Sequence, residues 1–510
     1  MHDRIHHEGL LQRRMSAEQA AALIKPGMTV AMSGFTGAGY PKAVPQALAL
    51  QMEEAHARGE DFQIKVLTGA STAPELDGVL AKAGGMELRL PYQSDPTLRK
   101  RINDGELEYI DIHLGHVAQY TWFGFYGHVD LAVIEVVGIN EDGSLIPSSS
   151  VGNNKTWIEQ ADKIILEVNV QQAAAMDGMH DVYYGTALPP HRKPIMLVNP
   201  DDRIGEPYLR LDPEKVIAVV ETDAPDRMTP FAAPDETSQQ IAAHLIDFFG
   251  DEIKAGRLTD KLLPLQSGVG NIANAVLGGL ATSGYTGLTA YTEVIQDGML
   301  HLIRDGVIRV ASATSFSLSP AGIEEFNSNI EFYRKRIILR TQEISNHPEL
   351  IRRLGCIAMN GMIEADLYGN VNSTHVAGTA MMNGIGGSGD FARNGFLSAF
   401  LSPSTAKGGK ISGIVPMVSH VDHTEHDTML VVTERGLADL RGLSPKQRAR
   451  TIIDKCAHPD FQPLLQDYFD RACRESFGKH TPHLLDEALS WHQRFVETGD
   501  SRAAVGAVSV

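Results

Sequence analysis

The sequence is poor in cysteine and in long apolar runs. Its three cysteines, Cys356, Cys456 and Cys473, form no C-x-x-C pair, so no disulfide framework is expected and a reducing cytoplasm fits best. No stretch of about 18 uncharged apolar residues occurs, so the sequence predicts no membrane-spanning helix. Residues 1–8 lack an apolar segment and carry acids, which argues against a secretory signal and a transit peptide.

The sequence also has too few basic residues to balance its acids. It contains 45 lysines and arginines against 63 aspartates and glutamates, which gives a formal net charge of −18. Nucleic acid and anionic membranes are therefore not expected as partners, because phosphate binding needs a basic face. A small anionic ligand would need a local lysine, arginine or group of backbone N–H donors.

Short apolar runs alternate with helical patterns along the chain. This β-α alternation with glycine-rich corners predicts an α/β fold with largely parallel sheets. A length of 510 residues exceeds what one hydrophobic core serves, so we expect two or three domains. The apolar runs are Met28–Met32, Ile64–Leu67, Leu131–Glu135, Lys163–Val168 and Val216–Val220.

A break in this pattern falls near residues 225–235. Pro225, Pro230 and Pro234 follow a strand-like segment, and an amphipathic helical pattern at 238–249 comes next. We therefore expect an N-terminal domain over residues 1–228 and a C-terminal domain over residues 229–510. The pattern of the last 60 or so residues predicts helices packed over the second domain.

Three glycine-rich corners are candidates for a functional site. The first, residues 33–41, allows either a tight turn or a close approach of the backbone to a neighbour. The second, residues 268–276, precedes a helical pattern, so its N–H groups could form an anion or oxyanion site. The third, residues 383–391, holds more glycines than a turn needs, and close approach of the backbone to a ligand explains them better.

Glu293 ends a strand-like segment, residues 287–293, that follows the helix of the second corner. Ligands of α/β folds bind at the carboxyl ends of strands, which would place Glu293 in a binding site. The local pattern alone favours a simpler interpretation, in which Glu293 stabilises the N-terminal end of a helix at 294–303. Both interpretations are open at this point.

A rival function is suggested by the second corner. Gly268-x-Gly270-x-x-Ala273, followed about twenty residues later by Glu293, fits the dinucleotide-binding fingerprint of nicotinamide-dependent dehydrogenases. Against this interpretation, Pro264 interrupts the segment in which a central parallel strand should stand.

Three histidines, His420, His423 and His426, have a spacing that suggests a metal site. Their acidic and polar neighbours indicate a loop, and buried hydrogen-bonded histidines or a polar lining near the ligand explain them better. No metal is predicted.

Considered together, the motifs of this sequence resemble the acetyl-CoA hydrolase/transferase group of class I CoA transferases, particularly the bacterial succinate CoA-transferases. The likeness covers nearly the whole chain, and several blocks in the same order are more specific than any single glycine motif. The blocks are SGFTGAGYPKAVP (33–45), LTGAS (67–71), PLQSGVGNIANAV (264–276), YTEVIQDG (291–298), QEISNHPELIRRLG (342–355), STHVAG (373–378), NGIGGSGDFARN (383–394), HVDHTEHD (420–427) and TERGLADLRGLSP (433–445).

The sequence departs from the wider class at two places. The class often has Glu-Asn-Gly around its nucleophile and Gly-Gly-Phe in the first corner, where this chain has Glu293-Val294-Ile295 and Ser33-Gly34-Phe35. Both departures fit the subgroup, but they weaken inferences from the substrates of the wider class.

The resemblance implies two α/β domains of the CoA-transferase type and a catalytic glutamate, which matches Glu293. The backbone N–H groups of Val269 and Gly387 would form the oxyanion hole, and Arg227 and Glu434 match supporting polar positions near the substrate. The residues implied to contact coenzyme A are Gly268, Val269, Gly270, Asn271, Ile272, Asn346, Asn383, Gly387 and Lys407.

The reaction implied by the resemblance is transfer of CoA between small carboxylic acids such as acetate, succinate and propionate. It would pass through an acyl-glutamyl anhydride and a γ-glutamyl-CoA thioester, with coenzyme A as a substrate and no permanently bound cofactor. The family suggests a homodimer. An acetyl-CoA hydrolase with the same residues is one alternative, and a nicotinamide-dependent dehydrogenase is a more remote one.

Overall fold

The computed structural model describes residues 2–227 and 234–502. The chain forms two compact units, the first made of Met1–Pro230 and Thr289–Leu354, the second of Phe231–Leu288 and Gly355–Val510. Glu293 therefore belongs to the first unit, although it follows the expected boundary in sequence. The division into domains 1–228 and 229–510 stays a prediction, and its junction at residues 228–233 lies outside the described residues.

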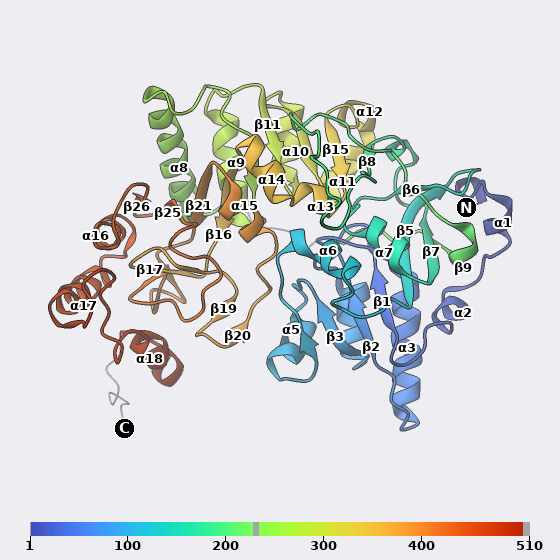
Figure 1. The fold of residues 1–510 in the computed structure, drawn as a ribbon, viewed down its shortest axis with the longest axis horizontal. Helices are drawn as coiled ribbons and strands as arrows, with labels where there is room; N and C mark the ends of the chain where they lie inside the picture. The colour runs from blue at the N-terminus through green and yellow to red at the C-terminus, as the bar shows by residue number, and fades with distance from the viewer. Residues whose placement is uncertain (1, 228–233, 503–510) are drawn as a thin grey trace. The chain divides into compact units, whose positions relative to one another are not determined.

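The first unit contains a sheet with strand order β4-β3-β2-β1-β5-β7-β9, with β6 paired to β5 (Figure 1). All of these pairs are parallel except β5 with β6. The strands are β1 Thr29–Met32, β2 Ile64–Leu67, β3 Met86–Leu90, β4 Glu108–Tyr109, β5 Leu131–Ile139, β6 Leu145–Pro147, β7 Lys163–Asn169 and β9 Val216–Thr222. Each of the five apolar runs singled out in the sequence is or contains one of these strands, or falls within one.

Helices cover this sheet and share its core. The apolar residues of α2, α3 and α4 pack against β1, β2 and β3, which buries the faces that the α/β pattern requires. The helices of this part are α1 Glu8–Leu11, α2 Ala17–Ala21, α3 Ala43–Ala57, α4 Val79–Lys82, α5 Pro96–Asn103, η3 Leu114–His116, α6 Val117–Trp122 and α7 Asn154–Gln160.

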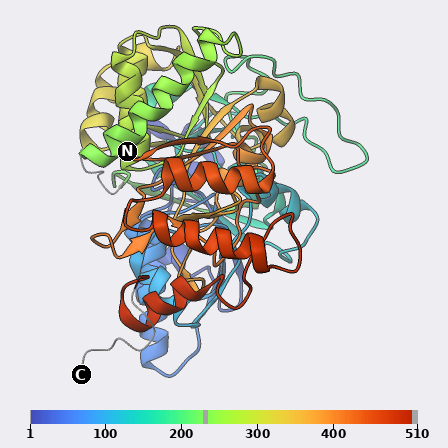
Figure 2. The same ribbon diagram turned by 90° about the vertical axis from the view of Figure 1, so that its left-hand side faces the viewer.

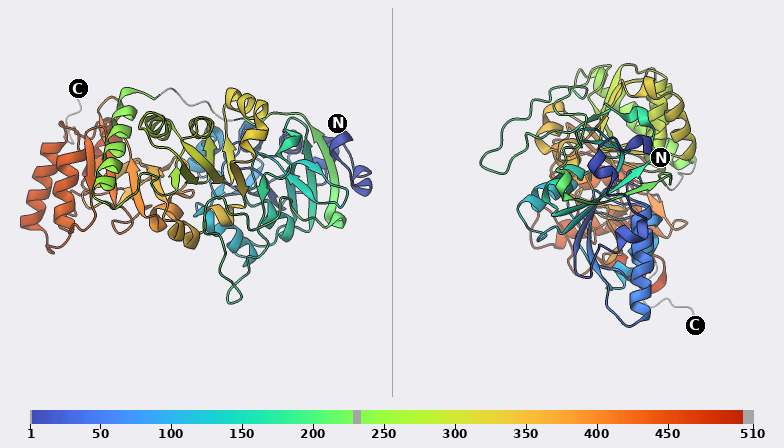
Figure 3. Two further views of the ribbon diagram at one scale, coloured as in Figure 1. Left: turned by 90° about the horizontal axis from the view of Figure 1, so that it is seen from above. Right: turned by 90° about the vertical axis from the view of Figure 1, so that its right-hand side faces the viewer.

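A second set of strands in the first unit is ordered β11-β13-β15-β8, with β15 parallel to both β13 and β8. The strands are β8 His180–Asp181, β11 Leu288–Tyr291, β13 Ile308–Ala313 and β15 Ile337–Arg340, and a short parallel pair joins β12 Val294–Gln296 to β14 Ser315–Ser317. The helices are α10 Asp297–Arg304, α11 Pro320–Ser328, α12 Ile330–Tyr333, α13 Gln342–Ser345 and α14 Pro348–Leu354. Between β8 and β9, residues 183–203 carry no named strand or helix and form a projecting loop (Figure 3).

The second unit has the strand order β26-β25-β21-β16-β10, parallel apart from the hairpin of β25 and β26. These strands are β10 Leu265–Ser267, β16 Ile357–Gly361, β21 Leu397–Leu401, β25 Leu430–Thr433 and β26 Gly436–Asp439, and the helices are α8 Glu236–Lys254, α9 Asn271–Thr282, α15 Ser388–Asn394, α16 Pro445–Cys456, α17 Gln462–Glu475 and α18 Ser490–Thr498. Small pairings join β17 Glu364–Asp366 with β18 Val371–Asn372 and β24 Ile414–Val415, β19 His375–Val376 with β20 Ala380–Met381, and β22 Thr405–Ala406 with β23 Ile411–Ser412.

The fold class predicted from the sequence, α/β with largely parallel sheets, is confirmed. As the sequence predicts, helices follow the sheet of the second unit: α16, α17 and α18 lie side by side and share this unit's core (Figure 2). Among the described residues, no helix combines the length and the apolar character needed to cross a membrane.

Candidate active site

Glu293 lies in the turn between β11 and β12 of the first unit. In parallel sheets the carboxyl ends of the strands meet at one edge, and the residues after β11, β13 and β15 share that edge. The backbone confirms the alignment, because the N–H groups of Thr314 and Ser315 donate to the Glu293 carbonyl at 2.9 and 3.1 Å. Glu293 therefore occupies the position at which α/β folds place ligands.

The alternative role for Glu293, an acid at a helix N-terminus, is wrong. The predicted helix 294–303 begins only at Asp297, because β12 occupies the first three residues. Asp297 itself supplies the acid of the first helical turn. Glu293 lies too far ahead of that turn to stabilise the helix dipole, which acts within about one turn.

Asn346 holds the Glu293 carboxylate. It follows α13 as the C-terminal cap, is fully buried, and donates from Nδ2 to Glu293 Oε1 at 2.8 Å. The Ser345 hydroxyl donates to Asn346 Oδ1 at 2.9 Å, which fixes the orientation in which the amide nitrogen faces Glu293. The structure thus brings together two of the residues that the sequence singled out.

The environment of Glu293 changes its protonation. Burial raises the pKa of this carboxyl from its ordinary 4.5 to about 7, because the charged form loses solvation, and the hydrogen bond from Asn346 opposes the rise. A carboxyl group with a pKa near 7 is partly ionised at neutral pH, and a poorly solvated carboxylate is a better nucleophile than one in water.

Substitution Asn346→Ala should shift the pH dependence of catalysis. Only ionised Glu293 can attack, so kcat/KM for an acyl-CoA should rise as pH increases through about 7. Without its donor the charged form is less stable, so the midpoint should move to higher pH and kcat/KM at pH 7 should fall about tenfold or more. The measurement is the profile of kcat/KM from about pH 5.5 to 9.

The matched control is Asn329→Ala, which removes an exposed asparagine that also caps a helix, α11, in the same unit. That variant should keep the wild-type profile. An unchanged midpoint in Asn346→Ala would show that this hydrogen bond does not stabilise the reactive carboxylate.

The second glycine corner has the predicted strand-loop-helix geometry. β10 ends at Ser267 and α9 begins at Asn271, with Gly270 at φ +124° as its cap. The objection raised by Pro264 was wrong, because the proline precedes the strand, where it is tolerated. Loop geometry alone therefore does not decide between a CoA site and a dinucleotide site.

The backbone donors of this corner are not equivalent. The Gly268 N–H donates to the Met359 carbonyl at 2.9 Å, so it is used within the unit. Within the described part of the chain the Val269 N–H has no acceptor, and neither has that of Gly387, the cap residue of α15 in the third corner. Two N–H groups that remain available are what an oxyanion site needs, although their assignment as catalytic donors stays a prediction.

Other residues of the second unit gather at the carboxyl edge of its sheet. Glu434, after β25, accepts hydrogen bonds from the Ser404 N–H at 2.8 Å and from the Ser404 hydroxyl, which ties it to the loop after β21. That loop leads to Lys407, which is exposed at φ +48° and places its ammonium 4.9 Å from the centre of the Phe495 ring. Asn383, at the start of the third corner, binds the next backbone N–H, that of Gly384, at 2.8 Å.

Arg227 lies beside a buried charge cluster of the first unit. It is exposed and pairs with Glu75 at 2.9 Å. Its neighbour Asp226 pairs at 2.9 Å with the fully buried ammonium of Lys42, which also binds Glu135. Burial raises the pKa of Glu135 to about 7, and the charge of Lys42 opposes this rise. Burial also acts to raise the pKa of Asp226, but the charge of Lys42 and the hydrogen bonds from Lys42, Ser149 and Gln172 together outweigh it, so this pKa falls.

The three histidines do not converge. His423 is buried against Phe400 with its ring 3.2 Å from the Ser388 hydroxyl, whereas His426 is 81% exposed. In residues 2–227 and 234–502, no group of three histidine, cysteine or acidic side chains is arranged to hold a metal ion.

Sequence analysis missed the charge cluster around Lys42 and a cavity next to α13. Lys42 lay inside the first quoted block, but a lysine beside a proline carries no signal of burial. The partners of Lys42 are Glu135 in β5 and Asp226, which lies 184 residues after Lys42, so only the fold brings these charges together.

The fold is shared with solved structures, one of which is named as a CoA-transferase. RipA from Yersinia pestis superposes with a TM-score of 0.68 at 22% identity, over 90% of this chain and 97% of that one. A 4-hydroxybutyrate CoA-transferase from Porphyromonas gingivalis gives 0.62 at 23% identity, over 90% and 98%. At these identities the likeness establishes the fold.

The chain belongs to the acetyl-CoA hydrolase/transferase family. The models of the family's N-terminal and C-terminal domains match residues 2–221 and 322–469. A succinyl-CoA:acetate CoA-transferase of Clostridium kluyveri is 50% identical over 98% of this chain and 92% of its own length. A propanoyl-CoA:succinate CoA transferase of Escherichia coli is 45% identical over 95% and 98%, and an acetyl-CoA hydrolase of Schizosaccharomyces pombe is 48% identical over 93% and 93%. The resemblance seen in the motifs is confirmed, and the chain is an enzyme of the acyl-CoA transferase and hydrolase class.

Proposed function

We propose that the protein transfers CoA between small carboxylic acids, with Glu293 as the covalent nucleophile. The observation that carries the proposal is the Glu293 carboxylate, held by Asn346 at the carboxyl end of β11 with its pKa raised to about 7. Membership of the acyl-CoA transferase and hydrolase family supports the proposal, as do relatives named as succinyl-CoA:acetate and propanoyl-CoA:succinate transferases.

The proposed reaction proceeds in exchanges that conserve the activated acyl group. A Glu293 oxygen attacks the thioester carbonyl carbon, the C–S bond breaks, and an acyl-glutamyl anhydride and CoA thiolate result. The thiolate then attacks the glutamyl carbonyl carbon, which releases the first acid and leaves a γ-glutamyl-CoA thioester. A second acid reverses both steps in a ping-pong sequence.

Each step passes through a tetrahedral oxyanion that needs hydrogen-bond donors. We assign this role to the N–H groups of Val269 and Gly387, whose availability is described above, with Gly268, Gly270, Asn271, Ile272, Asn383 and Lys407 as contacts of CoA. Arg227 and Glu434 are proposed to support the substrate, in which case Arg227 must exchange its pairing with Glu75 for a carboxylate.

Substitution Gly387→Val should reduce kcat without unfolding the protein. A branched side chain would crowd the approach to its N–H, and loss of one oxyanion donor costs about 2.7–4 kcal/mol, a hundred- to thousandfold in rate. Gly478→Val is the control, because Gly478 lies in the same unit and has open space around its α-carbon. A loss of less than tenfold at Gly387 would mean that the corner serves only as a turn.

Acetyl-CoA hydrolysis is the second candidate, because relatives 43–48% identical bear that name. Incubation with acetyl-CoA and succinate, followed by separation of the CoA esters, distinguishes the two reactions. New succinyl-CoA formed faster than free CoA supports transfer, and hydrolysis of acetyl-CoA that outpaces transfer to both succinate and propionate contradicts it. A cytoplasmic location and a homodimer remain predictions.

A further inference from the structure

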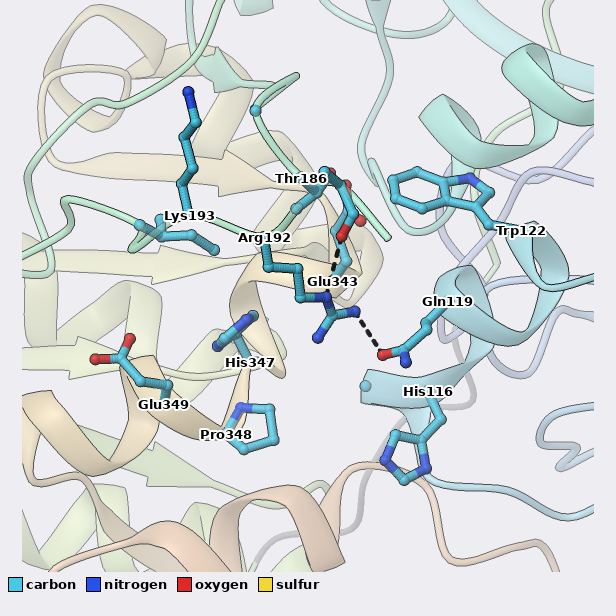
Figure 4. A pocket seen from close by; sticks show the side chains of 14 residues that line it. His116, Gln119, Trp122, Thr186, Arg192, Lys193, Glu343, His347, Pro348 and Glu349 are labelled. Atoms are coloured by element: carbon cyan, nitrogen blue, oxygen red, sulfur yellow. Dashed lines mark hydrogen bonds between the residues drawn. The ribbon is translucent and has the colours of Figure 1, made fainter. Parts of the chain in front are cut away.

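A cavity of ≈ 260 Å³ lies in the first unit beside α13, the helix that ends at Asn346. Its walls come from η3, α6, the projecting loop and the first residues of α14 (Figure 4). The volume is below the range of about 300–1,000 Å³ that drug-sized ligands occupy, and it suits a small organic molecule.

The cavity presents positive charge that the described protein does not neutralise. Arg192 is fixed by hydrogen bonds from Nη2 to Gln119 Oε1 at 2.6 Å and from Nε to the Ala187 carbonyl at 3.0 Å, which leaves Nη1 available. Figure 4 shows this guanidinium in the middle of the lining side chains. Among residues 2–227 and 234–502, neither Arg192 nor its neighbour Lys193 has a carboxylate within ion-pair distance.

The two acids of the lining already have partners. Glu343 accepts from the buried ammonium of Lys155 at 2.8 Å and from the Thr186 hydroxyl at 3.2 Å. Glu349 pairs with Arg353 one helical turn further on. The cavity is therefore locally positive in a chain whose formal net charge is −18, which favours an anion as ligand.

The rest of the lining suits a short carbon chain. Trp122, Ile195 and Pro348 supply apolar surface, and the Lys155 ammonium lies 4.4 Å from the centre of the Trp122 ring and holds it in place.

The histidines of the lining are neutral near pH 7. Burial lowers the pKa of both His116 and His347, and the charge of Arg192 lowers them further. The charge available to a ligand therefore comes from Arg192 and Lys193, while the imidazoles provide hydrogen bonds.

We propose that this cavity binds a small dicarboxylate non-covalently, with one carboxylate on Arg192, the other near Lys193, and the carbon chain against Trp122 and Pro348. Two uncompensated cations favour a dianion, and a guanidinium with a free edge recognises a carboxylate by direct hydrogen bonds. The site is separate from Glu293 and does not depend on the proposed function.

The test measures succinate binding by isothermal titration calorimetry in the Glu293→Ala background, in which no acyl-glutamate can form. One succinate should bind per chain, Arg192→Gln should weaken binding at least tenfold, and Lys193→Gln should weaken it less. Arg210→Gln is the control, because Arg210 is an exposed cation of the same unit already paired with Glu206. Both tested side chains are exposed, so the variants should keep their fold, as thermal unfolding can verify.

Three outcomes would overturn the assignment. They are unchanged succinate binding in Arg192→Gln, equal affinity for sulfate and succinate, and binding that is present in the wild type but lost in Glu293→Ala. The last outcome would place the acid at Glu293 and leave the proposed function intact. Conversely, binding that depends on Arg192 supports the second site whether or not Glu293 proves to be the nucleophile.

Discussion

Replacing Glu293 with alanine should abolish CoA transfer while the protein stays folded. The substitution removes the carboxyl group proposed to carry both covalent intermediates, and loss of such a nucleophile reduces kcat by about 10⁴-fold or more. The assay is formation of succinyl-CoA from acetyl-CoA and succinate. Borohydride added with acyl-CoA alone should reduce the glutamyl thioester in the wild type, and mass spectrometry should locate the change on the peptide that contains Tyr291–Glu293.

The controls separate loss of chemistry from loss of structure. Glu331→Ala removes an exposed acid of the same unit and should leave activity unchanged.

Because the pKa of Glu293 is raised in the folded state, protonation of Glu293 favours folding, and this contribution to stability is lost as pH rises through about 7. The free energy of unfolding of Glu293→Gln should therefore equal or exceed that of the wild type at pH 8. At pH 4, where Glu293 is protonated in the wild type, the two proteins should differ little. Near-normal transfer in Glu293→Ala would refute the mechanism.

Replacing Lys42 with methionine should destabilise the protein by about 3–5 kcal/mol. The ammonium is fully buried between Glu135 and Asp226, and removing one partner of a buried ion pair leaves an uncompensated charge. The free energy of unfolding, measured in urea, should fall most at high pH. At low pH the buried acids can take up protons, so the loss in the free energy of unfolding relative to the wild type should become smaller.

Lys100→Met provides the comparison for Lys42. Lys100 also pairs with an acid, Asp104, but its side chain is 75% exposed. Exposed pairs contribute about 0–1 kcal/mol, so this variant should unfold close to the wild type. Equal effects at the two positions would show that the buried cluster tolerates a missing cation.

Much of the fold could be predicted because its strands are continuous apolar runs. Parallel strands covered on both faces need apolar residues throughout, and β1, β2, β5, β7 and β9 show that pattern in the sequence. The pattern could not predict the return of residues 289–354 to the first unit, because strand pairing is not encoded in local periodicity. The helix predicted at 294–303 began three residues early for a similar reason, since β12 forms only by pairing with β14.

The candidate site was predictable where its residues stand in short motifs. Glu293, Gly268 and Gly387 were singled out from their own neighbours, and Asn346 from the resemblance. The reason Asn346 matters, its hydrogen bond to Glu293, links positions 53 residues apart and could not be read from spacing. The cavity around Arg192 was missed because its lining comes from segments far apart in the sequence.

The discontinuous first unit has a consequence for synthesis on the ribosome. Asp181 emerges early, yet its partner Arg340, with which it forms a buried ion pair, follows about 160 residues later. At about 5–20 residues per second, translation of that interval takes roughly ten to thirty seconds. During this time the nascent chain holds β8 without β15 and a carboxylate without its guanidinium. The first unit can be completed only after Leu354 has left the exit tunnel, so it is the kind of nascent segment that chaperones protect.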